Sequence, residues 1–401
     1  MKILVWNIKF FSKNRIVGQT ETQYQANENQ IRTANDAYRA QATLLYILST
    51  IKQADADVFV IVEPRASAGN PGTLADPDSG GAAGLILLLA HMRSSLGNTW
   101  WLVPPQRINT TRLDPIDRTS QYTECIGVFW RSDRVTFTGP WINTAKFPWS
   151  NGTAVEYSGE WKNVVPNGTT AAGRCLYFTN ENKLQGFPEV TSRLPFCTTF
   201  TEIGGTQRLL ELYSVHCDTY QGALAADALL KLPFSEADKK VTLIAGDFNI
   251  NVSASSTLDA TSLSALEELF TLLYPGPSVN VIGKGEQYRP TTVKSGPKAT
   301  PGLYAKKATL DYGLVHFSTN AFVTVPTCQV VDRVAVTPNP PFKQLMSYPL
   351  GAFTRQNDPL PVETFRGRWN YAKVGTPAML AASPAVLADG TSDHLPILLT
   401  V

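Results

Sequence analysis

One stretch of the chain combines a strand with side chains that could bind a cation. Residues 241–251 read VTLIAGDFNIN, in which a short apolar run leads into Gly246, Asp247, Phe248 and Asn249. Short apolar runs closed by a glycine turn are typical of central strands, and α/β sheets bind ligands at the carboxyl ends of such strands. Asp247 and Asn249 are two residues apart, so both project to one side of the chain. Their oxygens suit Mg²⁺ or a phosphate group better than a soft metal, and an Asx turn is the structural alternative.

The same pattern, an expected strand that delivers one polar residue at its end, recurs along the chain. The residues that fit it are Asn7, Glu63, His216, Asp247, Asp311 and His394. Each histidine, taken alone, is as readily an ordinary core residue. The recurrence of strand ends with one character favours a shared site instead.

The elements that must position these residues are mainly strands, with a few helices. Strands are expected at 2–8, 57–62, 100–103, 125–131, 194–200, 209–215, 241–245, 309–315 and 395–401. Apolar residues at helical spacing predict helices at 38–51, 85–96, 222–232 and 263–273. We expect loops at 64–81 and 283–307, aromatic hairpins at 139–191 and irregular chain at 321–389.

Composition limits the classes of partner. The chain has 401 residues, of which 43% are hydrophobic and 17% charged, so it can bury a large core. Its formal net charge of +2 gives no strong field toward nucleic acid or an anionic membrane, so any DNA affinity must come from a local patch. A loop with Arg107, Arg112 and Arg118 is either such a patch or simply solvated.

Cysteine usage and the chain's apolar runs bear on the compartment. Five cysteines without a CxxC pair argue against a zinc site and a full disulfide framework. The apolar runs at 1–11 and 85–90 are too short for a signal peptide or a membrane span. We therefore expect reduced thiols and a protein that is cytoplasmic as synthesised.

Six motifs occur in an order that resembles the endonuclease/exonuclease/phosphatase superfamily. They are WNI at 6–8, the strand ending in Glu63, SVH at 214–216, GDFN at 246–249, LDYGLV at 310–315 and SDHLP at 392–396. The resemblance is strongest to deoxyribonuclease I and its toxin relatives. Segments 63–65, 122–135 and 192–196 are similar to those that supply that subfamily's minor-groove Arg, histidine-orienting Glu and phosphate-binding Arg.

The resemblance implies a fold and a domain plan. Superfamily members form a four-layered α/β sandwich, in which two packed mixed β-sheets are flanked by helices and the site lies at the top of the sheets. We therefore expect residues 1–401 to form one such domain with insertions at about 65–120, 139–191 and 321–389.

The resemblance also implies roles for the site residues in phosphodiester hydrolysis. We expect Mg²⁺, which Mn²⁺ or Ca²⁺ could replace or assist, to be held by Glu63, Asn7, Asp247, Asn249 and Asp393. His394 oriented by Asp311 would be the general base, and His216 oriented by Glu124 the acid, although these two roles could be exchanged. The expected phosphate and substrate contacts are Arg193, Arg65, Tyr122 and, more weakly, Lys9 and Asn251. A solvated Arg65 and a packed Tyr122 are the structural alternatives.

The leading interpretation is a Mg²⁺-dependent, weakly sequence-selective DNA endonuclease. A sphingomyelinase-like or phosphoinositide phosphoesterase is the first alternative, because the aromatic segment 141–161 could be a membrane hairpin. A non-catalytic partner-binding scaffold is the second. A DNA-cutting enzyme in a cytosol endangers its host, so we expect a bacterial effector or defence nuclease that is either exported without a cleaved signal or held in check by an inhibitor or immunity protein.

Overall fold

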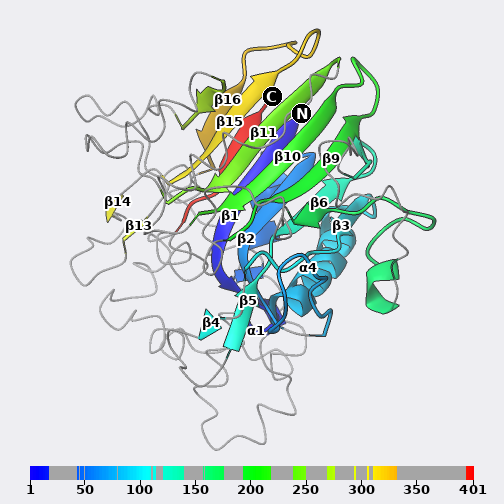
Figure 1. The fold of residues 1–401 in the computed structure, drawn as a ribbon, viewed down its shortest axis with the longest axis vertical. Coiled ribbons are helices and arrows are strands. Elements are labelled where there is room, and N and C mark those ends of the chain that lie inside the picture. Colours follow the sequence, from blue (N-terminus) through cyan, green and yellow to red (C-terminus); the bar gives the residue numbers. More distant parts are fainter. Residues whose placement is uncertain are drawn as a thin grey trace, which may run out of the picture.

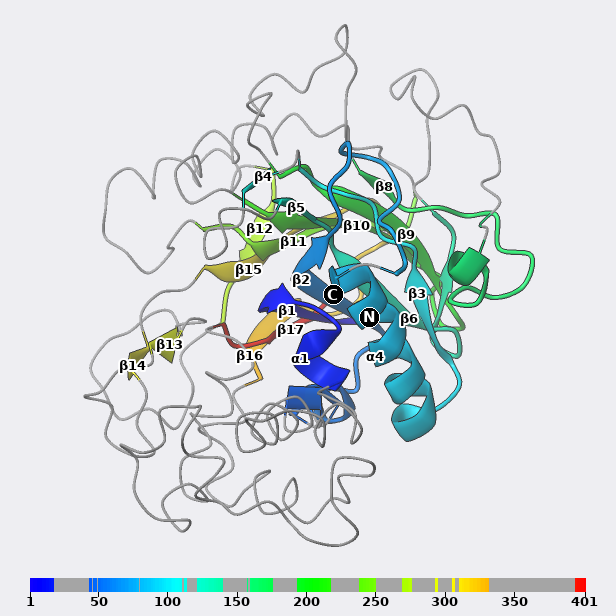
Figure 2. The same cartoon turned by 90° about the horizontal axis from the view of Figure 1, so that it is seen from below.

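The computed structural model shows two β-sheets packed face to face (Figures 1 and 2). It describes residues 1–17, 43–44, 46–48, 50–78, 80–109, 112–113, 121–139, 157, 159–175, 193–217, 238–249, 269–275, 293–294, 305–306, 310–331 and 394–401. Both sheets mix parallel and antiparallel neighbours. The architecture is the two-sheet α/β sandwich that the sequence predicts.

The first sheet has eight strands, among which β1 and β2 are the parallel pair. Its strands are β1 (Lys2–Phe11), β2 (Val58–Ala66), β3 (Trp100–Val103), β4 (Arg112–Leu113), β5 (Gln121–Glu124), β6 (Gly127–Arg131), β16 (Thr327–Val330) and β17 (Ile397–Thr400). The order is β16-β17-β1-β2-β5-β4, and β6 pairs with both β2 and β3. The last strand of the chain therefore lies beside the first, and the Met1 amine donates to the Val401 carbonyl at 2.6 Å.

The second sheet has seven strands in the order β12-β15-β11-β10-β9-β7, with β8 beside β9. These are β7 (Val135–Phe137), β8 (Arg174–Cys175), β9 (Phe196–Glu202), β10 (Leu209–His216), β11 (Lys240–Asp247), β12 (Thr271–Leu273) and β15 (Asp311–Phe317). Only β10 and β11 run parallel, since β9 and β15 flank them antiparallel. A separate two-stranded sheet consists of β13 (Val293–Lys294) and β14 (Ala305–Lys306).

Helices cover the outer face of the first sheet. The described helices are α1 (Asn14–Val17), α4 (Gly80–Leu96) and the short 3₁₀ helix η1 (Gly159–Lys162), together with helical turns at 43–44, 46–48 and 50–54. Figure 2 shows α1 and α4 on the side of β1 and β2 that faces away from β10 and β11. Gly84 permits a close approach, because a Cβ there would meet the Lys13 amide nitrogen at 2.7 Å.

Alternation along β1 explains how one strand serves both faces of its sheet. The Trp6 ring packs edge-on against Tyr46 of the helical layer, with ring centroids 5.7 Å apart. Its neighbour Asn7 projects the other way and reaches Asp247 of the second sheet. The polar side chain of Asn7 is thus directed into the interface between the sheets.

The sequence predictions are confirmed for the main strands and for α4, and they are wrong in three places. β2 continues past Glu63 and Pro64 to Ala66 instead of ending in a loop. Residues 271–273 form β12, an edge strand on β15, where a helix was expected. β16 is a regular strand inside the segment expected to be irregular, because β17 offers it an unpaired edge. The predicted helix at 222–232 lies outside the described residues.

The structure bears on the predictions about cysteines and membrane spans. All five cysteines are buried and free of disulfides. Among the described residues, no helix has the length and apolar content needed to cross a bilayer.

Candidate active site

Polar residues from five strands meet where the two sheets face each other. In the second sheet His216 lies opposite Asp247, and Asp247 lies opposite Asp311, so three neighbouring strands β10, β11 and β15 present polar residues at one edge. In the first sheet β1 and β2 bring Asn7 and Glu63 to the facing edge. The local pattern of polar strand ends therefore becomes a single cluster through sheet order and packing.

Asn7 ties the two sheets together through its side-chain amide. Its Nδ2 donates to Oε1 of Glu63 and to Oδ2 of Asp247, each at 2.9 Å, and the residue is fully buried. One amide thus holds a carboxylate from β2 and a carboxylate from β11 side by side.

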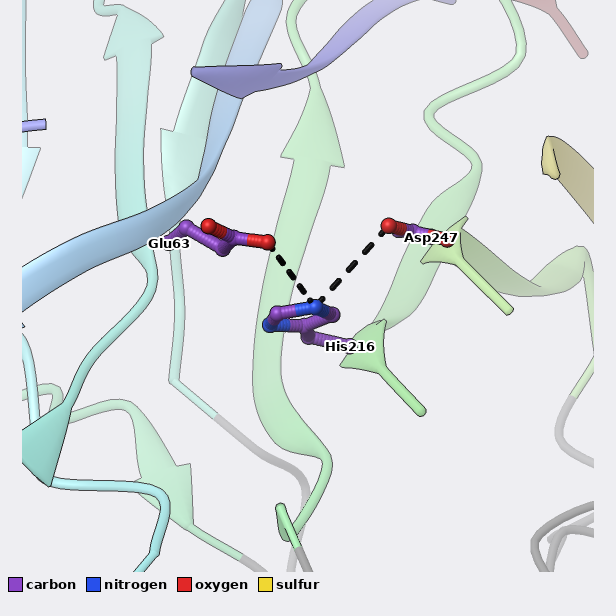
Figure 3. Close-up of side chains that lie close together, drawn as sticks. All are labelled: Glu63, His216 and Asp247. Carbon is purple, nitrogen blue, oxygen red and sulfur yellow. Dashed lines mark ion pairs between the residues drawn. The ribbon is translucent and has the colours of Figure 1, made fainter. Parts of the chain in front are cut away.

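The backbone at Glu63 is unusual. Its φ is 66°, in the left-handed region that bulky residues avoid, and the following residue is Pro64, which favours an extended predecessor. Such conformations are costly and persist where the surroundings enforce them, often at functional sites. Figure 3 shows the result: the Glu63 carboxylate points from β2 toward His216.

His216 is enclosed by three carboxylates. Its Nδ1 lies 2.9 Å from Oε2 of Glu124, while its Nε2 lies 3.1 Å from Oε1 of Glu63 and 3.8 Å from Oδ2 of Asp247 (Figure 3). Burial and the charge of Arg193 lower the pKa of His216, but Glu124 and Glu63 outweigh them and raise it to about 9. His216 is therefore protonated at neutral pH and donates from both ring nitrogens.

Glu124 is shared between His216 and Arg193. Arg193 forms a two-pronged pair with it, with Nε 2.5 Å from Oε2 and Nη2 2.9 Å from Oε1. Burial raises the pKa of Glu124, yet the charges of His216 and Arg193 prevail and lower it to about 2. For Glu63, likewise, burial raises the pKa, but the charge and hydrogen bond of His216 hold it well below its ordinary value.

One residue beside Glu124 was missed by sequence reasoning. Asn109 is fully buried, and its Oδ1 accepts a hydrogen bond of 2.7 Å from the backbone amide of Glu124. The contact fixes the end of β5 from a loop whose sequence shows no strand-end pattern. Only the pairing of residues 107–109 with 124–125 could have identified it.

His394 forms the second histidine–carboxylate pair. Its Nδ1 lies 2.8 Å from Oδ2 of Asp311, and its Nε2 lies 3.8 Å from Oδ2 of Asp247. The Trp6 indole donates to the backbone carbonyl of His394 at 2.9 Å, which anchors this residue to β1. Its side chain is 11% exposed, against 3% for His216, so His394 is the more accessible of the two.

The GDFN turn contains both an Asx turn and a side-chain oxygen that faces the cluster, the two alternatives that the sequence left open. The amide nitrogen of Asn249 donates to Oδ1 of Asp247 at 2.9 Å, which is an Asx turn. Oδ2 of Asp247 is left to face Asn7 and the two imidazoles. The Asn249 side chain donates to the Cys217 carbonyl at 2.7 Å, which joins the turn to the residue after His216.

The expected substrate contacts lie around the cluster or outside the described residues. Arg65 lies on the ring of Phe10, with its Cζ 4.3 Å from the ring centroid. Lys9 is exposed to solvent while Asn7 is buried, and the register of β1 shifts after Asn7. Tyr122 lies in β5 opposite Arg112, and only its backbone is described. Asp393 and Asn251 lie outside the described residues.

Arg107 does not belong to a phosphate patch. It is buried, and its guanidinium donates to the Ser67 carbonyl at 2.9 Å and to the Thr73 hydroxyl at 3.0 Å. A further hydrogen bond reaches the Leu74 carbonyl. Arg107 therefore holds the loop after β2 in place, and the side chains of Arg112 and Arg118 lie outside the described residues.

Two groups of side chains have the chemistry and spacing to hold a metal ion. Glu63, His216 and Asp247 form one, and Asp247, Asp311 and His394 form the other, with one ligand atom from each residue within 4.8 Å of the others. The carboxylates of Glu63 and Asp247 flank the Asn7 amide, so this end of the cluster is rich in oxygen donors. Such a donor set fits Mg²⁺ or a similar hard cation.

The sequence matches the family model described as "Endonuclease/Exonuclease/phosphatase family" over residues 4–394, so the chain belongs to this family. Family members are hydrolases that act on phosphodiesters or phosphate esters. Among curated proteins no match is found.

Solved structures similar to this chain carry different descriptions. An endonuclease/exonuclease/phosphatase family protein from Leptotrichia buccalis C-1013-b is 14% identical with a TM-score of 0.46, and the alignment covers 100% of this chain and 99% of that one. D. rerio TDP2 complexed with a single-strand DNA product is 10% identical with a TM-score of 0.42, covering 100% and 97%. A mannosyl-6-phosphatase from Bacteroides thetaiotaomicron VPI-5482 is 10% identical with a TM-score of 0.42, covering 100% and 98%.

Proposed function

We propose that this protein is a divalent-metal-dependent phosphodiesterase whose substrate is DNA. One observation carries the proposal: two imidazoles, each with Nδ1 on its own carboxylate, place Nε2 at 3.8 Å from the same oxygen of Asp247. A scissile phosphate bound at this point would have a proton acceptor and a proton donor within reach. A scaffold that only binds a partner would have no need for both pairs.

His394 is the general base in this proposal. Asp311 accepts a hydrogen bond from the Nδ1–H group, which directs the lone pair of Nε2 toward the cluster, where it takes a proton from the attacking water. The carboxylate then stabilises the imidazolium that forms. The greater exposure of His394 supports this role, because water must reach it.

His216 is the general acid. The Glu124 carboxylate on its Nδ1 stabilises the protonated ring, so His216 carries the proton that the departing 3′-oxygen needs. Glu124 holds the ring through Nδ1 and leaves the Nε2 proton directed at the cluster. In this proposal the acid role therefore belongs to His216 and the base role to His394.

The cation would be held mainly by Glu63 and Asp247, with Asn7 between them. When bound, Mg²⁺ neutralises the charge that builds up on the phosphate oxygens. Asn249 and Asp393 remain further predicted ligands. Mn²⁺ or Ca²⁺ could replace or assist Mg²⁺ at the same oxygen-rich end of the cluster.

Two features bear on the substrate. Arg193 is paired with Glu124 beside His216 and is only 13% exposed, which suits a guanidinium that contacts a nonbridging oxygen of a phosphodiester. The described aromatic residues of the insertion, Tyr157 and Trp161, are buried and hydrogen-bonded to the carbonyls of Ala171 and Ala75. These two rings therefore pack inside the protein and are unsuited to insert into a membrane.

Plasmid nicking tests the proposal. Purified protein with Mg²⁺ should convert supercoiled DNA to the open-circular form, EDTA should stop the reaction, and rising salt should weaken binding because phosphate contacts release counterions. The same protein should be offered RNA, sphingomyelin vesicles and a phosphoinositide. Hydrolysis of a lipid with none of DNA would replace the nuclease assignment, and binding without hydrolysis of any substrate would favour a scaffold.

The expected inhibitor or immunity protein can be tested through the host. If the protein is an effector or defence nuclease, expressing it without a partner should arrest growth and degrade chromosomal DNA. A matched His394→Ala strain should grow normally at the same protein level. Normal growth of cells that contain active enzyme would argue against a need for an inhibitor.

A further inference from the structure

A partly exposed aromatic–cation group adjoins the cluster, and it adds an aromatic ring with no role in the chemistry described above to two cations expected to contact substrate. It consists of Phe10, whose ring lies under the Arg65 guanidinium at 4.3 Å, and Lys9, whose Nζ lies 6.0 Å from the same ring centroid. Phe10 and Arg65 are half-buried and Lys9 is exposed. Proteins that bind single-stranded nucleic acids stack the bases on aromatic side chains and contact the phosphate backbone with nearby cations.

The backbone directs this group outward. Phe10 has a φ of 52°, and Glu63 on the neighbouring strand has a φ of 66°, so β1 and β2 are both distorted next to the cluster. The register between the strands shifts between Asn7 and Phe11, where Phe11 pairs with Pro64. A bulge of this kind re-aims side chains beside active sites. Here it keeps Phe11 fully buried and leaves Phe10 half-buried.

The connection to the reacting phosphate is short along both strands. Phe10 follows Asn7 by three residues, and Arg65 follows Glu63 by two. Arg65 also lies directly opposite Glu124 in the pairing of β2 with β5. A nucleotide next to the phosphate at the cluster would therefore reach Phe10 and Arg65 without extending far.

We propose that Phe10 and Arg65 form a stacking site for the nucleobase that flanks the scissile phosphate, with Lys9 attracting the adjacent backbone phosphate. The inference rests on the proposed nuclease function and makes it more specific. A base must leave the duplex stack to use this site, so the preferred substrate is a single-stranded or locally unpaired strand. A ring that merely covers Arg65 for packing would make no distinction between substrates with and without bases.

Binding measurements separate the two interpretations. In a His394→Ala background, fluorescence anisotropy would compare a labelled single-stranded oligonucleotide with one of equal length made of abasic tetrahydrofuran nucleotides. Phe10→Leu should weaken binding of the normal strand about tenfold, the size of one lost base–aromatic stack, and leave the abasic strand unchanged. Phe10→Tyr should retain the affinity, which shows that the fold tolerates changes at this position.

Phe322 supplies the matched control, because it is a phenylalanine that is 60% exposed. It follows the C-terminal end of β15, whereas Asp311 is the first residue of that strand. Phe322→Leu should bind both oligonucleotides like the parent. Equal weakening of both strands by Phe10→Leu, or no weakening of either, would overturn the stacking site. A separate hydrolysis assay tests the proposed function, which fails if the wild-type protein with Mg²⁺ hydrolyses no DNA. Absence of all oligonucleotide binding would overturn the stacking site as well.

Discussion

The imidazoles of His216 and His394 approach the same carboxylate oxygen, because each Nε2 lies 3.8 Å from Oδ2 of Asp247. Their other ring nitrogens contact different carboxylates, Glu124 at 2.9 Å and Asp311 at 2.8 Å. Only His216 also has Glu63 at 3.1 Å from its Nε2. Two like residues are thereby given different surroundings, which is how a site obtains an acid and a base from one side-chain type.

Removing either imidazole should abolish most of the activity. His216→Ala and His394→Ala should each lower kcat by ~10²- to 10⁴-fold, the usual contribution of one general acid or base. His91→Ala is the matched control, since His91 lies on α4 outside the cluster, and it should keep the parental rate. Steady-state kinetics on an oligonucleotide would measure all three, and a variant of either cluster histidine with the parental kcat would contradict its assigned role.

Stability should depend on pH through His216. Its folded pKa is raised from 6.5 to about 9, so the stabilisation it provides is complete below pH 6.5 and is lost as the pH rises to about 9. Glu124 acts at the other end, because its pKa falls from 4.5 to about 2 and its contribution disappears as the pH falls through that range. Urea unfolding in EDTA between pH 5 and 10 would measure the alkaline loss. His216→Ala should flatten it, and an unchanged slope would show that another group titrates.

Glu124 should matter more for stability than an exposed carboxylate in an ion pair. Glu124→Gln removes the charge that faces both His216 and Arg193 in a buried site, and such a change costs of order 3–5 kcal/mol. Asp55→Asn removes an exposed partner of Arg131 and should cost less than about 1 kcal/mol. Chemical denaturation of both variants at pH 7 gives the comparison. Equal costs would mean that the Glu124 network contributes little to folding.

Metal binding should be visible without any turnover. Mg²⁺ or Mn²⁺ should raise Tm, because a ligand that binds the folded state stabilises it, and EDTA should reverse the rise. Glu63→Gln removes one predicted ligand and should shrink the shift in Tm. Asp133→Asn, an exposed change beside Arg131, should leave the shift intact. A full shift in Glu63→Gln would assign the cation to other residues, of which Asp247, Asp311 and His394 are the second group.

Much of the site could be read from local sequence. His216, Asp247 and Asp311 were predicted because each stands at the end of an apolar run, and period-two alternation is a property of one strand alone. The two interpretations of GDFN, an Asx turn and a site for a cation or phosphate, were equally local. Asp247 takes part in both features, with Oδ1 in the turn and Oδ2 in the cluster.

Other features had no local signal. A proline normally demotes a strand, so β2 was expected to stop before Pro64, yet pairing with β1 and β5 carries it to Ala66. The apolar spacing at 263–273 suggested a helix, whereas the free edge of β15 takes residues 271–273 as a strand. Asn109 was missed because its importance comes from a neighbour 15 positions away, Glu124.

The sequence by itself determined the family, the places of the main core strands along the chain and the kinds of side chain that they carry to the site. Only the tertiary structure decided which carboxylate faces which nitrogen, since Glu63 and Asp247 belong to different sheets and meet at His216 only when those sheets pack. The physical reason is the range of the forces involved. Alternation and turn chemistry act over a few residues, whereas the pairing of His216 with Glu63 and Glu124 depends on strand order, register and the strained backbone at Glu63.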